Sequence, residues 1–411
     1  MIIWGVKRFL LWGERVFLFL FILFIPTQLG KHFWPEWSYV WGIRVDYLSP
    51  VLYFLDLLWL GWFGLRTLNG KKIEVKFTFS LFLFLLFVVI NILMAQNQIL
   101  SIYKWFRIGQ LVLTLIYFRF EREKIEKYLV KIIPIWVILE SLLGLVQVLI
   151  GSSVNGWMYF LGERRFAYAT LGVAQISIMG QGMVRAYGTF SHPNSLAGFL
   201  LVVLIFWFSK KKEVNRIFWW VTAWFSVMGV VISGSRIVWL LTLLMFLFMT
   251  YRQSRNKKKV LGLGIILVGI FLVLAAMISV NYRSSDFLGG WDKESLNKRI
   301  SLNMSAIRMI WEKPLFGVGL GNFVAKLPEV QKNDSYFWLQ PVHNIGLLAI
   351  SEVGLLGLIW VFLGLSGLIR TKITLNQKLI WVAILLTGMF DHYWLTLPQN
   401  TWLLLIMTAL L

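Results

Sequence analysis

The sequence predicts an all-α, polytopic integral membrane protein with about twelve transmembrane helices. Of its 411 residues, 58% are hydrophobic and only 14% are charged, whereas a soluble domain carries about 25% charged residues. Several apolar runs reach about 20 residues, the length needed to cross a bilayer. The basic residues behind the formal net charge of +21 lie in short clusters between these runs. No room remains for a large soluble domain, so we expect residues 1–411 to form a single transmembrane domain.

Twelve apolar segments follow one another along the chain, separated by polar or basic stretches. The first follows Lys7 and Arg8 and lacks a small-residue cleavage site, which favours a retained helix over a signal peptide. In chain order the predicted spans are 10–26, 47–65, 77–94, 99–118, 132–151, 195–209, 217–233, 236–251, 260–281, 344–369, 378–392 and 400–411.

The distribution of Lys and Arg predicts the topology. Basic clusters mark cytoplasmic loops, and long loops cross the membrane largely regardless of charge. Both termini are therefore expected in the cytoplasm, and the two long loops, 152–194 and 282–342, outside. The same clustering argues against nucleic acid as a partner, because no motif that reads DNA or RNA accompanies it. The basic clusters occupy one alternating set of segments, at 7–8, 66–76, 119–131, 210–216, 252–259 and 370–378.

The chain has no cysteine. Disulfide bonds, thiol catalysis and cysteine-ligated metals are therefore excluded. This composition suits either side of a membrane, so it does not decide the compartment.

The main outer loop, 282–342, contains a predicted amphipathic helix. Asp292 or Ser295 is a candidate N-cap, and Pro314 ends the helix. An apolar stripe at helical spacing indicates that this helix lies on the outer membrane surface. The stripe consists of Leu296, Ile300, Met304, Ile307 and Trp311.

Five charged residues fall inside predicted spans, where charge is costly. Counted inward from the outer ends, all lie in the outer half of the bilayer. Arg107 and Glu140 fall at similar depth on consecutive helices, so we hypothesise that they pair. Two interpretations remain open, a structural ion pair or a polar cavity open to the outer leaflet. The five are Asp56, Lys104, Arg107, Glu140 and Glu352.

Two stretches near the middle of the chain carry candidate binding residues. "RAYGTFSHPNSLAGFL" brings Arg185, His192, Pro193 and Asn194 to the start of a span; Asn194 is either a helix cap or a substrate contact. "ISGSRIVWL" places Arg236 at an outer helix mouth. Its planar guanidinium suits bidentate binding of phosphate oxygens, with snorkelling to lipid headgroups as the alternative.

Two further stretches follow. "KRISLNMSAIRMIWEKPLFGVGLGNF" contains Arg299 and a glycine-rich turn, a type of loop that can hold anions. "LQPVHNIGLLAISEVGLLG" places His343 and Asn344 at the mouth of an apolar helix. A lone histidine there is either interfacial or catalytic. Glu352, nine residues further along, lies about 180° around the helix, so we expect it to have a structural role.

Together these stretches resemble the O-antigen ligase and O-antigen polymerase superfamily of bacterial envelope glycosyltransferases, over about residues 185–394. His343, Asn344, nine residues, Gly354, two residues and Gly357 reproduce the superfamily's His-Asn signature. Leu358 stands where ligases often carry Thr or Val, which leaves ligase and polymerase both open. The first 150 residues resemble the family only as hydrophobic spans.

The resemblance implies a GT-C-type enzyme of the bacterial inner membrane that works without metal or cofactor. It would transfer a glycan from an undecaprenyl-diphosphate carrier to a lipid or glycan acceptor on the extracytoplasmic face, with membrane lipids as its other partners. The matching catalytic residues are His343, Arg299 and Arg236. Candidate substrate-binding residues are Arg185, His192, Asn194, Asn344 and Arg107.

Physical chemistry agrees with these roles. A departing diphosphate needs positive charge to stabilise it, and no DxD pair for a metal occurs in the chain. Arginines are therefore expected to hold the diphosphate, while histidine, which titrates near neutral pH, serves as base for the acceptor hydroxyl. Gly354 and Gly357 are expected to permit close helix packing.

Two alternatives stay open. One is a polymerase that extends the glycan on its own carrier, and the other is a polyprenyl-glycan flippase or transporter. A transporter is expected to spread essential charges through both halves of the membrane, whereas the charges in this sequence concentrate in the outer half.

Overall fold

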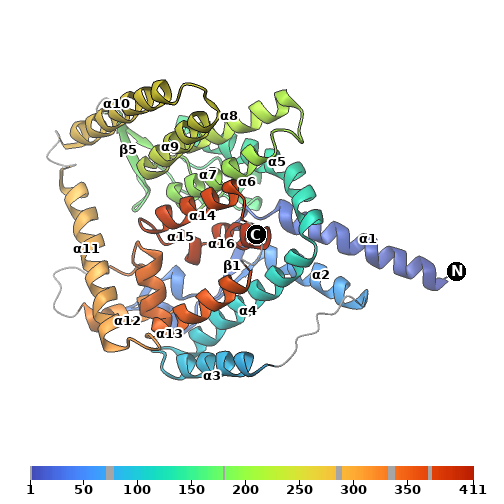
Figure 1. Cartoon of the computed structure of the whole chain (residues 1–411). Coiled ribbons are helices and arrows are strands. Elements are labelled where there is room, and N and C mark those ends of the chain that lie inside the picture. The colour runs from blue at the N-terminus through green and yellow to red at the C-terminus, as the bar shows by residue number, and fades with distance from the viewer. Residues whose placement is uncertain (1, 71–77, 179–180, 284–288, 332–337, 369–372) are drawn as a thin grey trace. The chain divides into compact units, whose positions relative to one another are not determined.

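The computed structural model describes residues 2–70, 78–178, 181–283, 289–331, 338–368 and 373–411 (Figure 1). The all-α prediction is confirmed in its coarse form, because the described residues are mostly helical with a few short strands. A helix lies on each of the twelve predicted apolar segments. Three described helices are long and apolar enough to cross a membrane, at Gln98–Phe120, Arg122–Ile150 and Ile345–Gly367.

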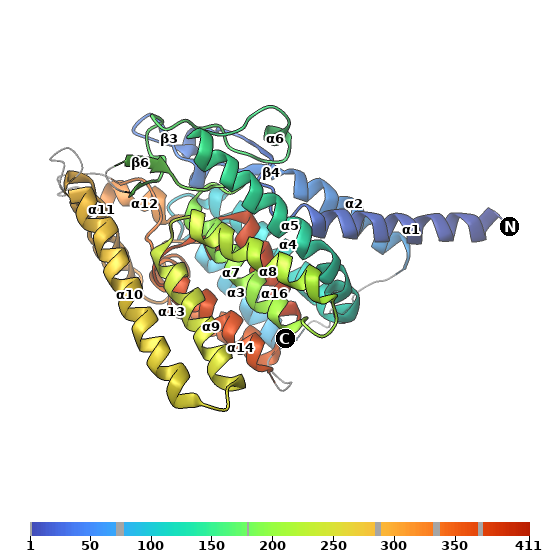
Figure 2. The same cartoon turned by 90° about the horizontal axis from the view of Figure 1, so that it is seen from above.

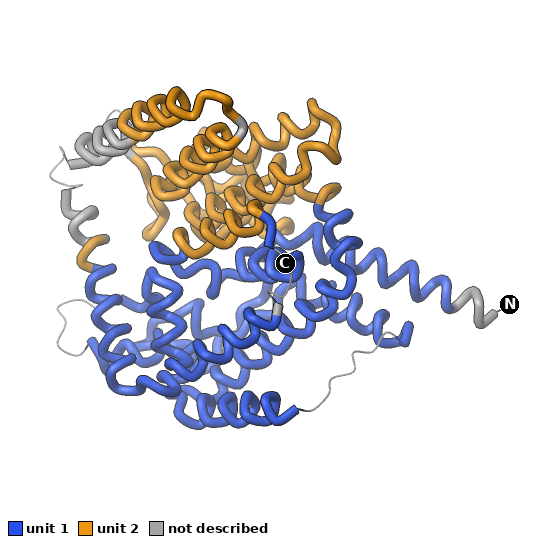
Figure 3. The backbone as a smooth tube through the Cα atoms, in the orientation of Figure 1, with its two compact units in different colours: residues 1–129, 298–374, 388–411 blue, residues 130–297, 375–387 orange. Residues whose placement is uncertain are grey.

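The chain forms two compact units, each built from segments far apart in sequence (Figure 3). Unit 1 contains residues 1–129, 298–374 and 388–411, and unit 2 contains residues 130–297 and 375–387. Within unit 1, α1 packs along α2 (Figure 2). Its helices are α1 (Ile2–Leu23), α2 (Phe54–Leu68), α3 (Phe79–Leu93), α4 (Gln98–Phe120), most of α11 (Gly289–Glu312), α12 (Phe323–Val330), α13 (Ile345–Leu368), α15 (Tyr393–Thr396) and α16 (Pro398–Ala409).

The first loop of unit 1 is structured, and it corrects the predicted start of the second span at residue 47. Helix α2 begins only at Phe54, where the Asp56 carboxylate accepts the Tyr53 amide at 2.8 Å. Before it, two antiparallel strand pairs and two 3₁₀ turns occupy the chain. They are β1 (Gly30–His32) with β4 (Val51–Tyr53), β2 (Tyr39–Val40) with β3 (Ile43–Arg44), and the turns η1 (Glu36–Ser38) and η2 (Asp46–Leu48).

A hydrophobic core joins this first loop to α11, α12 and the start of α13. From the loop it takes Val45 and Leu48, and from α11 it takes Met309. The helix α11 begins at Gly289, upstream of the two predicted caps. Its predicted apolar stripe lies on the opposite, exposed side, with Trp311 82% exposed. One face of α11 is therefore packed in the core, and the other is available to a lipid surface.

Helix α13 is interrupted at Gly354, whose φ of 65° and ψ of −175° lie outside the helical region. The amides that follow lose their helical partners, and those of Leu355 and Leu356 donate instead to the carbonyls of Pro314 and Leu315, at 2.9 and 3.1 Å. A Cβ at position 354 would lie 2.3 Å from the Leu315 oxygen. The backbone does pack closely at Gly354, but against the loop after α11 and not against another helix as predicted.

Asn91 of α3 binds this same loop. Its Nδ2 donates to the carbonyls of Phe316, at 2.7 Å, and Glu352, at 3.0 Å. Its Oδ1 accepts from the Trp105 indole at 2.9 Å and from the Leu320 amide at 3.0 Å. Because Asn91 is fully buried, this four-bond set holds α3, α4, α13 and the glycine-rich loop together.

Glu352 has the structural role that helix geometry predicted. Its carboxylate accepts hydrogen bonds from the amides of Gly321, at 2.9 Å, and Phe323, at 3.2 Å. These bonds hold the glycine-rich turn against the start of α12.

In the part that the structure describes, unit 2 is a helical bundle with one antiparallel strand pair. Its central helix α7 is almost wholly buried and packs on α8, while α9 packs on α10 (Figure 2). The elements are α5 (Arg122–Ile150, which starts in unit 1), α6 (Trp157–Phe160), β5 (Gln175–Ile178) paired with β6 (Gln181–Val184), α7 (Pro193–Ser209), α8 (Arg216–Ile232), α9 (Arg236–Gln253), α10 (Lys257–Arg283) and α14 (Leu375–Gly388, whose last residue lies in unit 1).

The hypothesised pairing of Arg107 with Glu140 is replaced by separate partners within each unit. Arg107 forms an ion pair with Asp56 of α2. The Glu140 carboxylate accepts the amide and the hydroxyl of Thr189, both at 2.8 Å. Comparing depths along two helices could not predict these partners, because Asp56 lies on a third helix and Thr189 in a loop.

Candidate active site

The candidate site in unit 1 is a cluster of two histidines and one carboxylate. His343 precedes α13, and its Nδ1 lies 3.4 Å from Oδ1 of Asp391. The neighbouring His392 has its Nε2 4.0 Å from the same oxygen, and the two imidazole rings are 5.1 Å apart. Asp391 and His392 are buried, whereas the side chain of His343 is 19% exposed. His343 is therefore the member of the cluster that a substrate can reach.

His392 is held in place from two sides. Its Nδ1 lies 2.7 Å from the Thr396 hydroxyl, and the Tyr47 ring of η2 stands edge-on to it at 5.5 Å. Burial lowers the pKa of His392 to about 4, against the opposing effect of the Asp391 carboxylate, and the charges of His343, Lys298 and Arg299 lower it further. His392 is therefore neutral near pH 7 and does not neutralise the Asp391 carboxylate. The negative charge of Asp391 can then act on His343.

Two cations of α11 stand beside the cluster. The Arg299 guanidinium donates to the Phe390 carbonyl at 3.4 Å, next to Asp391 in the chain. Lys298 lies over the Trp338 ring at 5.0 Å. The structure thus brings predicted residues His343 and Arg299 together in one unit.

Asn344, the second residue of the His-Asn signature, caps α13. Its Oδ1 accepts the Leu347 amide at 3.0 Å, and its Nδ2 donates to the Met389 carbonyl at 3.3 Å. Asn344 therefore fixes the start of α13 directly after His343, and it ties this turn to the segment that carries Asp391.

The cluster can also be considered as a metal site. One ligand atom from each of His343, Asp391 and His392 lies within 4.8 Å of the other two. Two imidazoles and a carboxylate are ligands that zinc accepts. Lys298 and Arg299 oppose a divalent cation by charge, so the metal-free mechanism stays our prediction.

Three other predicted binding residues, Arg185, His192 and Asn194, lie in unit 2 around the start of α7. Arg185 donates from Nε to the Ser233 carbonyl and from Nη2 to Oδ1 of Asn194, both at 2.6 Å. The cap of α7 is His192, whose Nδ1 accepts the Asn194 amide at 3.2 Å. The interpretation of Asn194 as the cap is therefore wrong, and its side chain anchors Arg185 instead.

Arg236 is the first residue of α9 and is exposed. It follows the Ser233 turn that Arg185 binds, in which Gly234 has a φ of 65°. Arg185 thus positions the turn that presents Arg236. Arg107, in unit 1, is engaged by Asp56.

Sequence reasoning missed Asp391, His392 and Tyr47. The first two closed a predicted span at 378–392, yet α14 already ends at Gly388. Two adjacent titratable residues after Phe390 were the signal that the apolar run had ended. Tyr47 was counted within the span 47–65, and only the folded first loop brings it to His392.

Fold and site together define a helical membrane protein with a histidine–carboxylate pair beside cationic side chains. Residues 221–362 match the family described as O-Antigen ligase. A general O-oligosaccharyltransferase from Acinetobacter baylyi is 23% identical to the chain over 239 residues, which cover 52% of this chain and 42% of that relative. The alignment thus spans less than half of the relative. These matches confirm the resemblance to O-antigen ligases that the motifs predicted.

Proposed function

We propose that the chain transfers a glycan from an undecaprenyl-diphosphate carrier to an acceptor hydroxyl, as an O-antigen ligase-like glycosyltransferase that needs no metal. The observation that carries this proposal is the 3.4 Å approach of His343 to Asp391 beside Arg299. A histidine close to a carboxylate and flanked by cations is suited to proton removal next to a departing anion.

The proposed step uses both edges of the imidazole. Nδ1 of His343 faces Asp391, so Nε2 on the opposite edge takes the proton of the acceptor hydroxyl. The acceptor oxygen bonds to the anomeric carbon of the donor sugar, and the bond from that carbon to the diphosphate oxygen breaks. The leaving diphosphate keeps the electron pair, and Arg299 stabilises its charge. Asp391 stabilises the imidazolium that forms.

The resemblance assigns Arg236 to the diphosphate. Arg185, which binds Asn194, positions the turn before Arg236, and Arg185, His192 and Asn194 stay candidates for substrate binding. We further propose a GT-C-type membrane domain with about twelve spans in the bacterial inner membrane, both termini cytoplasmic and the site extracytoplasmic. The matched names, an O-antigen ligase family and a general O-oligosaccharyltransferase, support transfer to a separate acceptor over polymerisation.

The decisive experiment is transfer by purified protein in nanodiscs with a lipid-linked donor. His343→Ala should abolish transfer while the protein stays folded, and Arg308→Ala on the same unit is the matched control, since Arg308 binds the Val330 carbonyl away from the cluster. Transfer retained by His343→Ala would reject the base assignment. Glycan on a separate acceptor indicates a ligase. Growth of the carrier-linked chain indicates a polymerase, and movement of the glycan across the bilayer without transfer indicates a flippase. A chelator should leave the rate unchanged.

Topology has its own test, which the cysteine-free sequence makes simple. Glu312→Cys should react with a membrane-impermeant maleimide in intact cells, whereas Arg8→Cys should react only after lysis. The reverse pattern would reject the proposed orientation.

A further inference from the structure

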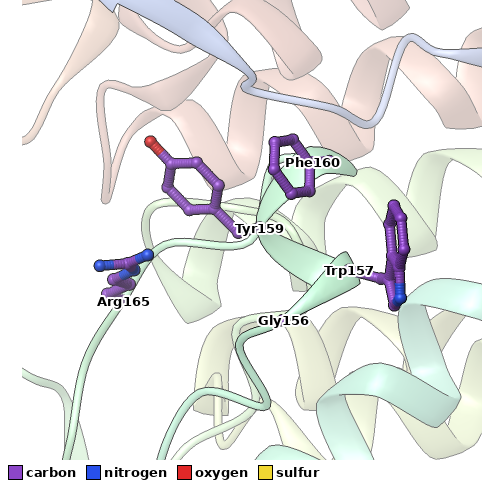
Figure 4. A pocket seen from close by; sticks show the side chains of 5 residues that line it. All are labelled: Gly156, Trp157, Tyr159, Phe160 and Arg165. Carbon is purple, nitrogen blue, oxygen red and sulfur yellow. The ribbon is translucent and has the colours of Figure 1, made fainter.

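The loop after α5 carries a hollow that the proposed mechanism does not use. Gly156, Trp157, Tyr159, Phe160 and Arg165 line it, and its volume is about 400 Å³ (Figure 4). Small-molecule sites have volumes of about 300–1,000 Å³. All five residues belong to unit 2, so the hollow is defined within one compact part of the chain.

A buried carboxylate builds the turn beneath the hollow. Glu163 is 3% exposed, and its two oxygens accept the amides of Val154 and Asn155, both at 2.7 Å. The amide of the Gln147 side chain donates to the same group at 2.9 Å. The loop is therefore fixed to the last turns of α5. Asn155 and Gly156 have φ values of 64° and 59°, which reverse the chain and project the residues that follow.

Ser153 closes the base of the loop. Its hydroxyl donates to the Phe166 carbonyl and accepts the Phe166 amide, both at 3.0 Å, and its own amide donates to that carbonyl at 2.9 Å. The rings between these two anchors are thus displayed on a loop whose conformation is set before any ligand arrives. Such preorganisation lowers the entropy that binding costs.

The projected rings are open to the surroundings. Trp157 is 83% exposed, Phe160 63% and Tyr159 42%. The Arg165 guanidinium carbon lies 4.9 Å from the centre of the Tyr159 ring, and Figure 4 shows Phe160 between Tyr159 and Trp157. Large exposed apolar groups that cluster on a rigid support mark an interaction site. The lining contains no acidic side chain, and its one charged group is a cation.

We propose that this hollow is a glycan-binding subsite that holds a sugar ring of the donor or acceptor away from the reacting carbon. A pyranose presents a face of C–H groups, which fits against an aromatic ring, and an edge of hydroxyls, which the guanidinium of Arg165 can bind as donor. Tyrosine and tryptophan supply large rigid contact area at low entropic cost. The choice of a glycan rests on the proposed function.

A lipid-headgroup anchor is the competing occupant, because Trp and Tyr gather at membrane interfaces. To anchor the protein in the headgroup region, aromatic rings need only project into the lipid. An open hollow with a guanidinium stacked on one of its rings offers a partly polar surface, which suits a small polar ring better. The experiment therefore compares binding of a lipid-free glycan with the stability of the protein in a bilayer.

The binding test uses full-length protein in nanodiscs of phosphatidylethanolamine and phosphatidylglycerol. The probe is the free oligosaccharide released by mild acid from the producing cells' polyprenyl-linked glycan, followed by saturation-transfer NMR. Trp157→Ala and Phe160→Ala should each weaken binding about tenfold, a change of about 1.4 kcal/mol. Trp311→Ala is the matched control, since Trp311 is 82% exposed on α11. Trp157→Phe, which keeps a ring, should retain most of the binding.

Five outcomes decide the proposal. No binding by the wild type, or equal binding by Trp157→Ala and Trp311→Ala, overturns it. Loss of stability in nanodiscs by Trp157→Ala without loss of glycan binding assigns the hollow to lipid and also overturns it. Binding that depends on Trp157 and persists in His343→Ala supports the subsite. If such binding occurs but the wild type transfers nothing, only the proposed function fails.

Discussion

Acidification should destabilise unit 1 through one buried histidine. The pKa of His392 is about 4 in the folded chain, because burial disfavours its charged form, against an ordinary value of 6.5. The unfolded chain therefore binds this proton first as the pH falls. The contribution of His392 to stability is complete above about pH 7 and is lost progressively between about pH 6.5 and pH 4.

The magnitude follows from the two pKa values. Between about pH 7.5 and pH 5, His392 alone lowers the free energy of unfolding by about 2 kcal/mol, and by about pH 4 the loss reaches about 3 kcal/mol. For a unit of this size, 1 kcal/mol corresponds to about 2–4 °C in the midpoint of thermal unfolding. The midpoint should thus fall by about 4–8 °C between the first two pH values on account of His392.

The assay is thermal unfolding of the purified protein in nanodiscs, followed by tryptophan fluorescence across this pH range. Other groups also titrate, so the wild type is compared with His392→Asn, whose amide can keep the bond to Thr396 but does not ionise. The variant is expected to start less stable and to show a shallower decline toward acid. Parallel curves for the two proteins would refute the reasoning, since the slope would then come from elsewhere.

Three other changes test the site and its support. Asp391→Asn should leave the protein folded and lower kcat by about 10²–10⁴, because His343 loses the charge that stabilises its protonated form; an unchanged initial rate would contradict this. Gly354→Ala should cost about 1–3 kcal/mol in unfolding free energy, since its φ of 65° is strained for alanine and Cβ would meet Leu315; a wild-type denaturation midpoint would contradict it. Asn91→Ala should cost at least about 3 kcal/mol, because four buried hydrogen bonds lose their partner, as chemical denaturation in micelles can measure.

Helix positions could be predicted from the sequence because lipid and core both demand apolar runs. A helix lies on every predicted apolar segment, and α3 and α8 end within two residues of the predicted bounds. The second span failed at its start, because apolar residues 47–53 pack in the first loop instead of continuing α2. Hydropathy alone cannot separate residues buried against lipid from residues buried against protein.

Charged partners were harder to predict than helices. Arg107 and Glu140 were predicted to pair because they lie at similar depth in the membrane. In the structure Arg107 forms an ion pair with Asp56, and Glu140 accepts a hydrogen bond from Thr189. Depth is one coordinate, whereas pairing also depends on which helix faces which and on loops that fold back. The structural role of Glu352 was predictable because it needed only the 100° step of a single helix.

The histidine proposed as the base could be selected from a local signature, but the groups around it could not. His343 and Asn344 are adjacent in sequence, and helix capping explains why the two occur together. Asp391 lies at the far end of another segment, and Tyr47 in the first loop; both reach the cluster only through tertiary packing. That packing also explains why a second histidine adjoins the first. Buried and neutral, His392 can occupy the second side of Asp391 without competing for its charge, so the carboxylate acts on the one imidazole that remains accessible to substrate.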